Sequence, residues 1–213
     1  MITYLVDLDG TLIDPKAGMV GAFRKALREL GRDDLASGGL DWIIGPPVIG
    51  SFETLLGSRG EAGEALRRYR RHYSAGGALF DFSVYPGAIE AVAALRASGQ
   101  VYVCTMKPES LAGPILASLD MPVGLFGADL DGAIREKGQV LRRAVDELAA
   151  DPSLCLVIGD RGSDMAAALE AGMPGLGVTW GYGTPAELRA SGARALCHSP
   201  ADLAQAARDL MGG

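Results

Sequence analysis

The chain has 213 residues, of which 48% are hydrophobic and 22% are charged, a balance typical of globular proteins and too apolar for disorder. Its 20 basic and 26 acidic residues give a net charge of −6, so we expect no general attraction to a nucleic acid polymer or a membrane. Three widely spaced cysteines, Cys104, Cys155 and Cys197, predict reduced and mostly buried thiols. With no signal-peptide or membrane-helix pattern, the sequence predicts a cytoplasmic protein.

The first predicted elements are a buried strand and a long helical stretch. Residues 2–6 form an apolar run that leads into DLDGTLID, and a short bounded run of this kind predicts a strand covered on both faces. No strand pattern follows before residue 82, so we expect a helical insertion. Helical periodicity covers residues 20–30, 49–56 and 61–75 of this stretch.

Beyond a predicted hinge at residues 83–87, strands alternate with helices, which indicates βαβ units. The predicted fold class is α/β, with a Rossmann-like parallel sheet, helices on both of its faces and a small helical cap inserted after the first strand. We expect residues 1–14 and 83–213 to form the core and residues 15–82 the cap. The predicted helices cover residues 88–97, 109–119, 138–149 and 164–171, and the strands cover residues 101–105, 123–126, 154–158 and 176–179.

Two carboxylates close the first predicted strand. Asp7 and Asp9 are two residues apart, so on a strand they point to the same face, where they could serve Mg²⁺ binding and proton transfer. An EF-hand loop that begins at Asp7 is excluded, because Leu12 and Gly18 stand where that loop needs Gly and Glu. A second acidic string, DLDG at residues 129–132, has no good strand pattern before it and is interpreted as a loop.

Phosphate-binding groups are expected after the strand at residues 101–105. This strand runs into Thr105, Met106 and Lys107, where a hydroxyl and backbone N–H groups could hold a phosphate oxygen. Lys137 stands at the start of a later helical run. Each of these signals is weak by itself, because a threonine is common in strands and a single lysine is usually solvated.

Two further acids, Asp160 and Asp164, follow the apolar strand LCLVIG in the string GDRGSD. Ligands of open parallel sheets bind at the carboxyl ends of the strands. Four carboxylates that converge at this edge would repel each other unless a cation lay between them. An insertion that leaves the sheet at the same edge would cover such a site like a lid.

In this order, the strings resemble the motifs of the haloacid dehalogenase superfamily of aspartyl-phosphate hydrolases, over almost the whole chain. DLDGTLID is similar to the first motif, Thr105 to the second, Lys137 to the third and GDRGSD to the fourth. CTMKPES, ADLDG and GVTWGYG resemble the phosphoglycolate phosphatase group. IGPP at residues 44–47 is similar to that segment in the bacterial 5′-nucleotidase-like branch.

The resemblance implies a Mg²⁺-dependent phosphatase that acts on a small phosphomonoester, with phosphoglycolate or a nucleoside monophosphate as candidate substrates. It makes Asp7 the nucleophile and Asp9 the general acid and base. It also implies three further sets of residues: Thr105, Met106 and Lys137 for the phosphoryl group; Asp7, Asp160, Asp164 and the carbonyl group of Asp9 for Mg²⁺; and residues of the cap for the substrate, with Gly45, Pro46 and Pro47 as the candidates. These three residues are either substrate contacts or only a helix-breaking turn.

Several alternatives stay open at this point. A phosphosugar mutase would share both acids of the first motif, and a regulator that binds Mg²⁺ or phosphate without turnover would keep all of them. Dehalogenase chemistry is disfavoured by Asp9, because a halide leaving group needs no proton. The basic stretch at residues 67–71 is either a substrate contact or a solvated helix face. The sequence is compatible with a monomer or a homodimer.

Overall fold

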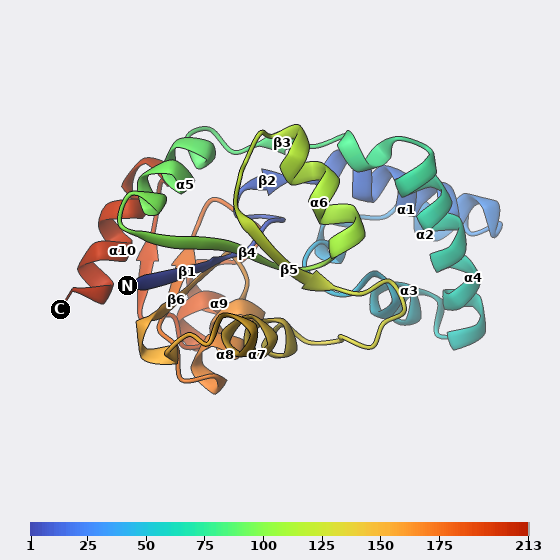
Figure 1. Ribbon diagram of the computed structural model, residues 1–213. Coiled ribbons are helices and arrows are strands. Elements are labelled where there is room, and N and C mark those ends of the chain that lie inside the picture. The colour runs from blue at the N-terminus through green and yellow to red at the C-terminus, as the bar shows by residue number, and fades with distance from the viewer. Residues whose placement is uncertain (213) are drawn as a thin grey trace. The chain divides into compact units, whose positions relative to one another are not determined.

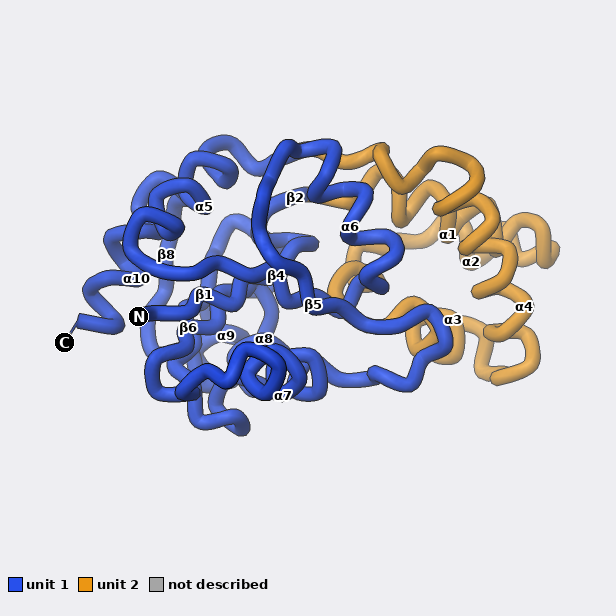
Figure 2. Tube along the Cα trace, viewed as in Figure 1, with its two compact units in different colours: residues 1–13, 84–213 blue, residues 14–83 orange. Residues whose placement is uncertain are grey.

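The computed structural model describes residues 1–212, which divide into two compact units. One unit contains residues 1–13 together with 84–212, and the other contains Asp14–Ser83 (Figure 2). The chain passes between them at two short strands, β2 (Ile13–Asp14) and β3 (Ser83–Val84), which pair with each other. None of the helices over residues 1–212 is long and apolar enough to cross a membrane.

The first unit is built on a six-stranded sheet in the order β5-β4-β1-β6-β7-β8, in which every described pairing is parallel. Helices cover both faces, with α5, α6 and α10 on one side and α7, α8 and α9 on the other (Figure 1). The predicted fold class is therefore confirmed. The strands are β1 (Ile2–Val6), β4 (Gly99–Pro108), β5 (Gly124–Ala128), β6 (Cys155–Gly159), β7 (Gly175–Val178) and β8 (Ala195–Cys197).

The helices of this unit follow the strands as parallel topology requires. An apolar cluster that includes Leu5, Phe126, Val140 and Leu141 is buried between the sheet and α7. The three cysteines are free and buried, and burial raises the pKa of the Cys104 thiol to about 12. The helices are α5 (Ala88–Arg96), α6 (Glu109–Ser118), α7 (Lys137–Leu148), α8 (Gly162–Glu170), α9 (Pro185–Ala190) and α10 (Leu203–Met211).

The second unit is helical and has its own core. The rings of Phe23 and Phe52 are stacked with centroids 3.8 Å apart, and Tyr69 meets both of them edge-on. Between Lys16 and Phe82, all of which the structure describes, no strand occurs, as expected. Its helices are α1 (Lys16–Glu29), α2 (Asp33–Ala36), α3 (Val48–Leu56) and α4 (Arg59–Arg70), and α4 continues into a π-helical turn over Arg71–Ala75.

Candidate functional site

The first candidate residues stand where the central strand of the sheet ends. Asp7 directly follows β1, and its backbone N–H donates a 2.8 Å hydrogen bond to the carbonyl group of Ile158 on β6. The chain then turns back at Gly10, which has a φ of +84° and donates to the carbonyl group of Ile13. Glycine adopts this left-handed conformation at little cost. The turn keeps Asp7 and Asp9 at the carboxyl edge of the sheet.

Lys137 joins the acids that follow β1 and β6. Its ammonium group lies 2.7 Å from Oδ1 of Asp7 and 2.6 Å from Oδ1 of Asp164, and its side chain is 4% exposed. Lys137 is the first residue of α7, and the loop before it is held by the Gln139 side chain, which accepts hydrogen bonds from the backbone N–H groups of Arg135 and Glu136. The third and first predicted motifs therefore meet in space.

Asp160 and Asp164 are positioned by the backbone around them. Oδ2 of Asp160 accepts a 2.7 Å hydrogen bond from the N–H of Tyr182, and Oδ2 of Asp164 accepts one from the N–H of Arg161 at 3.1 Å. The loop between the two acids is also tied to α9, because Glu187 accepts from the N–H of Gly162 at 2.7 Å. Asp160 is fully buried, so these contacts fix its orientation.

Three of the acids form a group that suits a hard divalent cation. Asp7, Asp160 and Asp164 each offer a carboxylate oxygen, and these oxygens all lie within 4.8 Å of one another. Carboxylate oxygens are ligands that Mg²⁺ prefers, and it usually keeps waters and substrate oxygens as its other ligands. The residues present therefore fit Mg²⁺. The carboxylate of Asp9 is not part of this group; the sequence expectation for Asp9 concerned its carbonyl group and stays a prediction.

The electrostatics of the site reflect acids crowded into a buried space. Burial raises the pKa of Asp7 to about 7, with the Asp164 charge adding to the shift and Lys137 opposing it. Burial also raises the pKa of Asp160 to about 8, helped by the charges of Asp164 and Asp7. Burial by itself would lower the pKa of Lys137, but Asp164 and Asp7 outweigh it and hold that pKa above its usual range. A bound cation would relieve this repulsion.

The strand end at Thr105 carries a site residue that the sequence analysis did not assign. Sequence patterning placed the end of this strand at residue 105, whereas β4 continues to Pro108 through a shift in register that begins after Thr105. Lys107 lies in this irregular stretch, and its ammonium group contacts both carboxylate oxygens of Asp9, at 2.6 and 2.9 Å. Sequence spacing carries no signal for this contact, because Asp9 and Lys107 are 98 positions apart and Lys107 lies in the stretch where the register shifts.

Thr105 and Met106 lie beside this pair. Thr105 is 1% exposed, and its hydroxyl oxygen accepts a 3.1 Å hydrogen bond from the N–H of Lys107. The Met106 side chain packs against the apolar cluster under α7. The side chain of Met106 therefore faces the core, and its backbone N–H is the group that is left to bind a ligand. Bulges of this kind are common next to active sites, where they redirect side chains.

The DLDG string at residues 129–132 lies in a loop, as expected, but one premise was wrong. A strand does precede it, because β5 runs to Ala128. The carboxylate of Asp129 accepts hydrogen bonds from the backbone N–H groups of Ala133 and Ile134, at 2.9 and 2.8 Å. These bonds lower the pKa of Asp129. The Asp129 side chain therefore stabilises the loop in which it lies.

The predicted substrate contacts of the cap lie in the second unit. Gly45, Pro46 and Pro47 connect a short turn at Asp41–Ile43 to α3, and Gly45 has a φ of +104°. Both prolines are exposed. Their assignment to substrate binding stays a prediction.

The basic stretch of α4 is engaged in ion pairs with acids of its own unit. Arg68 pairs with Glu64 at 2.7 Å and with Glu29 at 3.8 Å, and Arg71 pairs with Glu29 at 2.7 Å. His72 contacts the same Glu29 carboxylate at 2.7 Å. These pairs join α4 and its π-helical continuation to α1. They favour the interpretation of this stretch as a charged helix surface.

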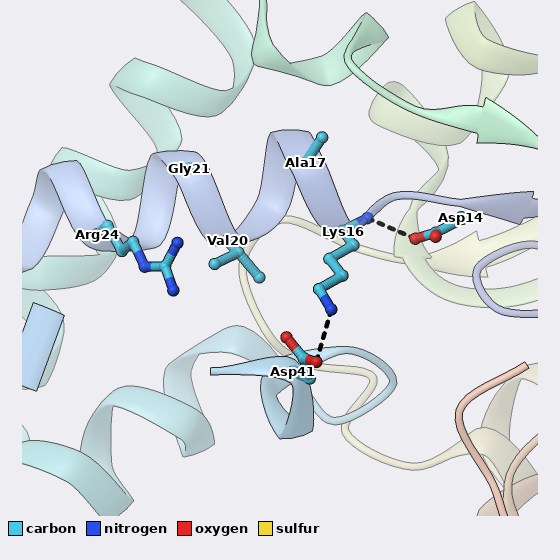
Figure 3. Close-up of a pocket in the computed structure, with 7 residues that line it drawn as sticks. All are labelled: Asp14, Lys16, Ala17, Val20, Gly21, Arg24 and Asp41. Atoms are coloured by element: carbon cyan, nitrogen blue, oxygen red, sulfur yellow. Dashed lines mark hydrogen bonds and ion pairs between the residues drawn. The ribbon is translucent and has the colours of Figure 1, made fainter. Parts of the chain in front are cut away.

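The second unit also contains a cavity of about 400 Å³ beside the start of α1. The Lys16 ammonium group lies 2.6 Å from Oδ2 of Asp41 across it, and the two side chains point toward each other (Figure 3). Gly45, Pro46 and Pro47 are not among the residues that line it. The residues that line the cavity are Asp14, Lys16, Ala17, Val20, Gly21, Arg24 and Asp41.

The family follows from the match of the chain to a family model. Residues 2–172 match the model of the haloacid dehalogenase-like hydrolases. The chain belongs to this family. The hydrolase is 34% identical to a 5′-nucleotidase of Pseudomonas aeruginosa, over 94% of this chain and 93% of that protein. It is also 34% identical to a phosphoglycolate phosphatase of Cupriavidus necator, over 95% of each chain.

A solved structure shows the same likeness. A predicted phosphatase from Clostridium acetobutylicum is similar to the hydrolase with a TM-score of 0.90 and 30% identity, over 98% of both chains. The family predicted from the four motifs is therefore confirmed, as is the enzyme class, a phosphatase of this family.

Proposed function

We propose that this hydrolase is a Mg²⁺-dependent phosphatase that cleaves a small phosphomonoester of the phosphoglycolate type through a phosphorylated Asp7. The observation that carries the proposal is the setting of Asp7, whose carboxylate lies 2.7 Å from the Lys137 ammonium group and shares a 4.8 Å cluster with Asp160 and Asp164. A carboxylate can attack a phosphate dianion only where positive charge cancels their repulsion. At this edge of the sheet, the Lys137 ammonium group supplies positive charge beside Asp7.

In the proposed reaction, Asp7 attacks the phosphorus atom and the bond to the leaving oxygen breaks. Asp9 donates a proton to that oxygen, and then takes a proton from the water that hydrolyses the phosphorylated Asp7. Lys137 neutralises charge on the phosphoryl group, while the Thr105 hydroxyl and the N–H of Met106 donate hydrogen bonds to its oxygens. Dividing one difficult displacement into two easier ones suits phosphomonoesters, which hydrolyse very slowly without a catalyst.

Asp7, Asp160, Asp164 and the carbonyl group of Asp9 would hold the metal ion. Bound Mg²⁺ would supply positive charge at the phosphoryl oxygens and at the attacking carboxylate. The chain's own groups still set the reacting geometry, because Asp160 and Asp164 are fixed by backbone N–H donors. We also keep the prediction of a cytoplasmic enzyme whose partner is its small-molecule substrate.

A 5′-nucleotidase is the second candidate. It is favoured by the 34% identity to the Pseudomonas aeruginosa 5′-nucleotidase over nearly the whole of both chains. The two candidates share the reaction at Asp7 and differ in the leaving group. The proposed cap contacts at Gly45, Pro46 and Pro47 would then meet a glycolate or a nucleoside.

A hydrolysis screen at fixed Mg²⁺ tests the proposal. Phosphoglycolate, nucleoside monophosphates, sugar phosphates and an aryl phosphate should be compared, with released phosphate as the readout. We expect the highest kcat/KM with phosphoglycolate, loss of activity in excess chelator, and poor activity with Ca²⁺, whose looser coordination misplaces the reacting groups. Full activity in chelator would contradict the metal assignment. Transfer of phosphate between two positions of a sugar phosphate, without release, would indicate a mutase.

A further inference from the structure

Two of the four lysines of the chain are buried, and only one of them has a place in the proposed reaction. Lys16 and Lys25 are not buried, whereas Lys107 and Lys137 are 7% and 6% exposed. Lys137 lies between Asp7 and Asp164, on the side of the site where the metal ligands gather. Lys107 contacts Asp9 instead, through both carboxylate oxygens. The second buried ammonium group therefore needs its own explanation.

Stability alone is a poor explanation for the pair of Lys107 and Asp9. Their side chains are 4% and 12% exposed. Removing two charges from water costs free energy that their attraction often fails to recover, so a buried ion pair is weak support for a stabilising role. An ammonium group at this point is better explained by an anion that reaches the site.

The position of Lys107 places its charge near the leaving group. A general acid must come within about 2.6–3.2 Å of the oxygen that it protonates. Lys107 Nζ is 2.6 and 2.9 Å from the Asp9 oxygens. The ammonium group therefore lies within roughly 6 Å of the leaving oxygen when Asp9 acts. A carboxylate two bonds from that oxygen falls within this range, whereas a hydroxyl there would gain much less from a buried cation.

We infer that Lys107 is a specificity-determining residue that binds a carboxylate on the leaving group, and that the substrates are phosphate monoesters of short 2-hydroxycarboxylates. This inference rests on the proposed function, because it assigns Asp9 to the leaving oxygen. The substrate carboxylate joins Asp9 at the Lys107 ammonium group. The register shift of β4 after Thr105 sets Lys107 at the same strand end as the proposed phosphate contacts.

Two esters that differ only in that carboxylate test the inference. 2-Phosphoglycolate carries it, and 2-hydroxyethyl phosphate has a neutral hydroxymethyl group in its place. We expect the wild type to prefer 2-phosphoglycolate in kcat/KM by roughly 10- to 100-fold, the range for a hydrogen bond to a charged group. Lys107→Met should abolish most of this preference, and Lys107→Arg should keep part of it. Lys25→Met, on the exposed surface of α1, is the matched control.

The ratio of the two esters separates recognition from support of Asp9. If Lys107→Met lowers kcat/KM equally for both esters, Lys107 acts through Asp9 alone and the inference is wrong. The wild type gives a test that needs no variant to fold, because equal kcat/KM values for the two esters would also overturn it. If the wild type hydrolyses an aryl phosphate but does not prefer 2-phosphoglycolate to 2-hydroxyethyl phosphate, only this inference is wrong. One that releases no phosphate from any ester contradicts the proposed function itself.

Discussion

The two acids of the first motif have different partners, although they are two residues apart. Asp7 contacts Lys137 and belongs to the carboxylate cluster, whereas Asp9 contacts Lys107 and lies outside that cluster. The first arrangement suits a nucleophile held close to positive charge. The second keeps the Asp9 carboxylate apart from the carboxylate cluster, so that it is free to serve a different role. We therefore expect the two residues to fail in different ways when they are changed to Asn.

Asp9→Asn should trap the intermediate that Asp7→Asn cannot form. A good aryl leaving group departs without a proton, so Asp7 of the Asp9→Asn variant is still phosphorylated, while hydrolysis of the phosphorylated Asp7 slows by about 10²–10⁴-fold for want of a base. Intact-protein mass spectrometry after an acid quench should show one added phosphoryl group in Asp9→Asn and none in Asp7→Asn. Equal phosphorylation of both variants would place the nucleophile elsewhere.

At the scale of elements, the loops after β1, β6 and β7 pack together through their backbones. A Cβ atom added to Gly181 would overlap the carbonyl oxygen of Gly10 and Oδ2 of Asp160. The indole N–H of Trp180 donates a 2.9 Å hydrogen bond to the carbonyl group of Thr11. The loop after β7 therefore holds Asp160 in place against the turn that follows Asp7.

Gly181→Ala should weaken Mg²⁺ binding. The new methyl group has no space unless Asp160 moves, and overpacking of this kind costs typically about 1–3 kcal/mol. Isothermal titration calorimetry with Mg²⁺ should show a Kd raised by roughly tenfold or more. Gly50→Ala is the matched control, because a Cβ atom there meets nothing within 4 Å. Unchanged Mg²⁺ affinity in Gly181→Ala would show that this loop does not position Asp160.

Sequence patterns predicted the elements that carry strong signals and missed those that do not. β1 and β6 are mostly apolar and almost entirely buried, so they stood out, whereas β8 (Ala195–Cys197) is an edge strand of three residues, two of them half-buried. The motif acids were predictable because their spacing repeats a known order. Lys107 was not, because its contact with Asp9 joins residues 98 positions apart and depends on the register shift in β4.

At the scale of the whole molecule, the chain is a sheet unit with a helical unit inserted between β1 and β4. β2 and β3 pair with each other, so the two ends of the insertion lie side by side. The helical unit packs its own aromatic core around Phe23 and Phe52, both fully buried. We therefore expect the sheet unit to keep its strand order and its candidate site if the insertion is removed.

Replacing residues 15–82 with a short turn should separate chemistry from substrate selection. We expect the shortened protein to keep most of its hydrolysis of an aryl phosphate, because Asp7, Lys137 and the proposed metal ligands remain. Turnover of a small natural substrate should fall much further, because a cap excludes water and adds contacts. Steady-state kinetics with both substrates decide the matter, with circular dichroism to verify the fold. Equal losses would mean that the insertion only supports the structure.

The stability of the metal-free protein should fall as pH rises from 5 to 8. The pKa values of Asp7 and Asp160 are raised from 3.8 to about 7 and about 8, so the folded protein binds more protons than the unfolded chain across this range. Their contribution is full below about pH 4 and is lost as pH passes 7 and 8. Each extra proton is worth about 1.4 kcal/mol per pH unit, and each kcal/mol moves Tm by roughly 2–4 °C.

Thermal unfolding in chelator and in Mg²⁺ measures this dependence. The rise in Tm on adding Mg²⁺ should be larger at pH 8 than at pH 5, because the ion competes with protons for the same carboxylates. Asp160→Asn should flatten the dependence on pH in chelator, and Asp131→Asn, at an exposed acid, should not. A Tm that rises between pH 5 and pH 8 in chelator, with Asp160→Asn unaltered, would contradict the raised pKa values.

The central place of β1 has a consequence for how the enzyme loses activity. β1 pairs with β4 on one side and β6 on the other, and the N–H of Asp7 is bonded to Ile158. Amides in such a strand exchange with deuterium only when the whole sheet opens, whereas an edge strand such as β8 opens at lower free energy. We therefore expect Asp7 to be among the most slowly exchanging amides. Partial opening at the β8 edge should then leave Asp7, the proposed nucleophile, in place, and heating should abolish hydrolysis only at global unfolding.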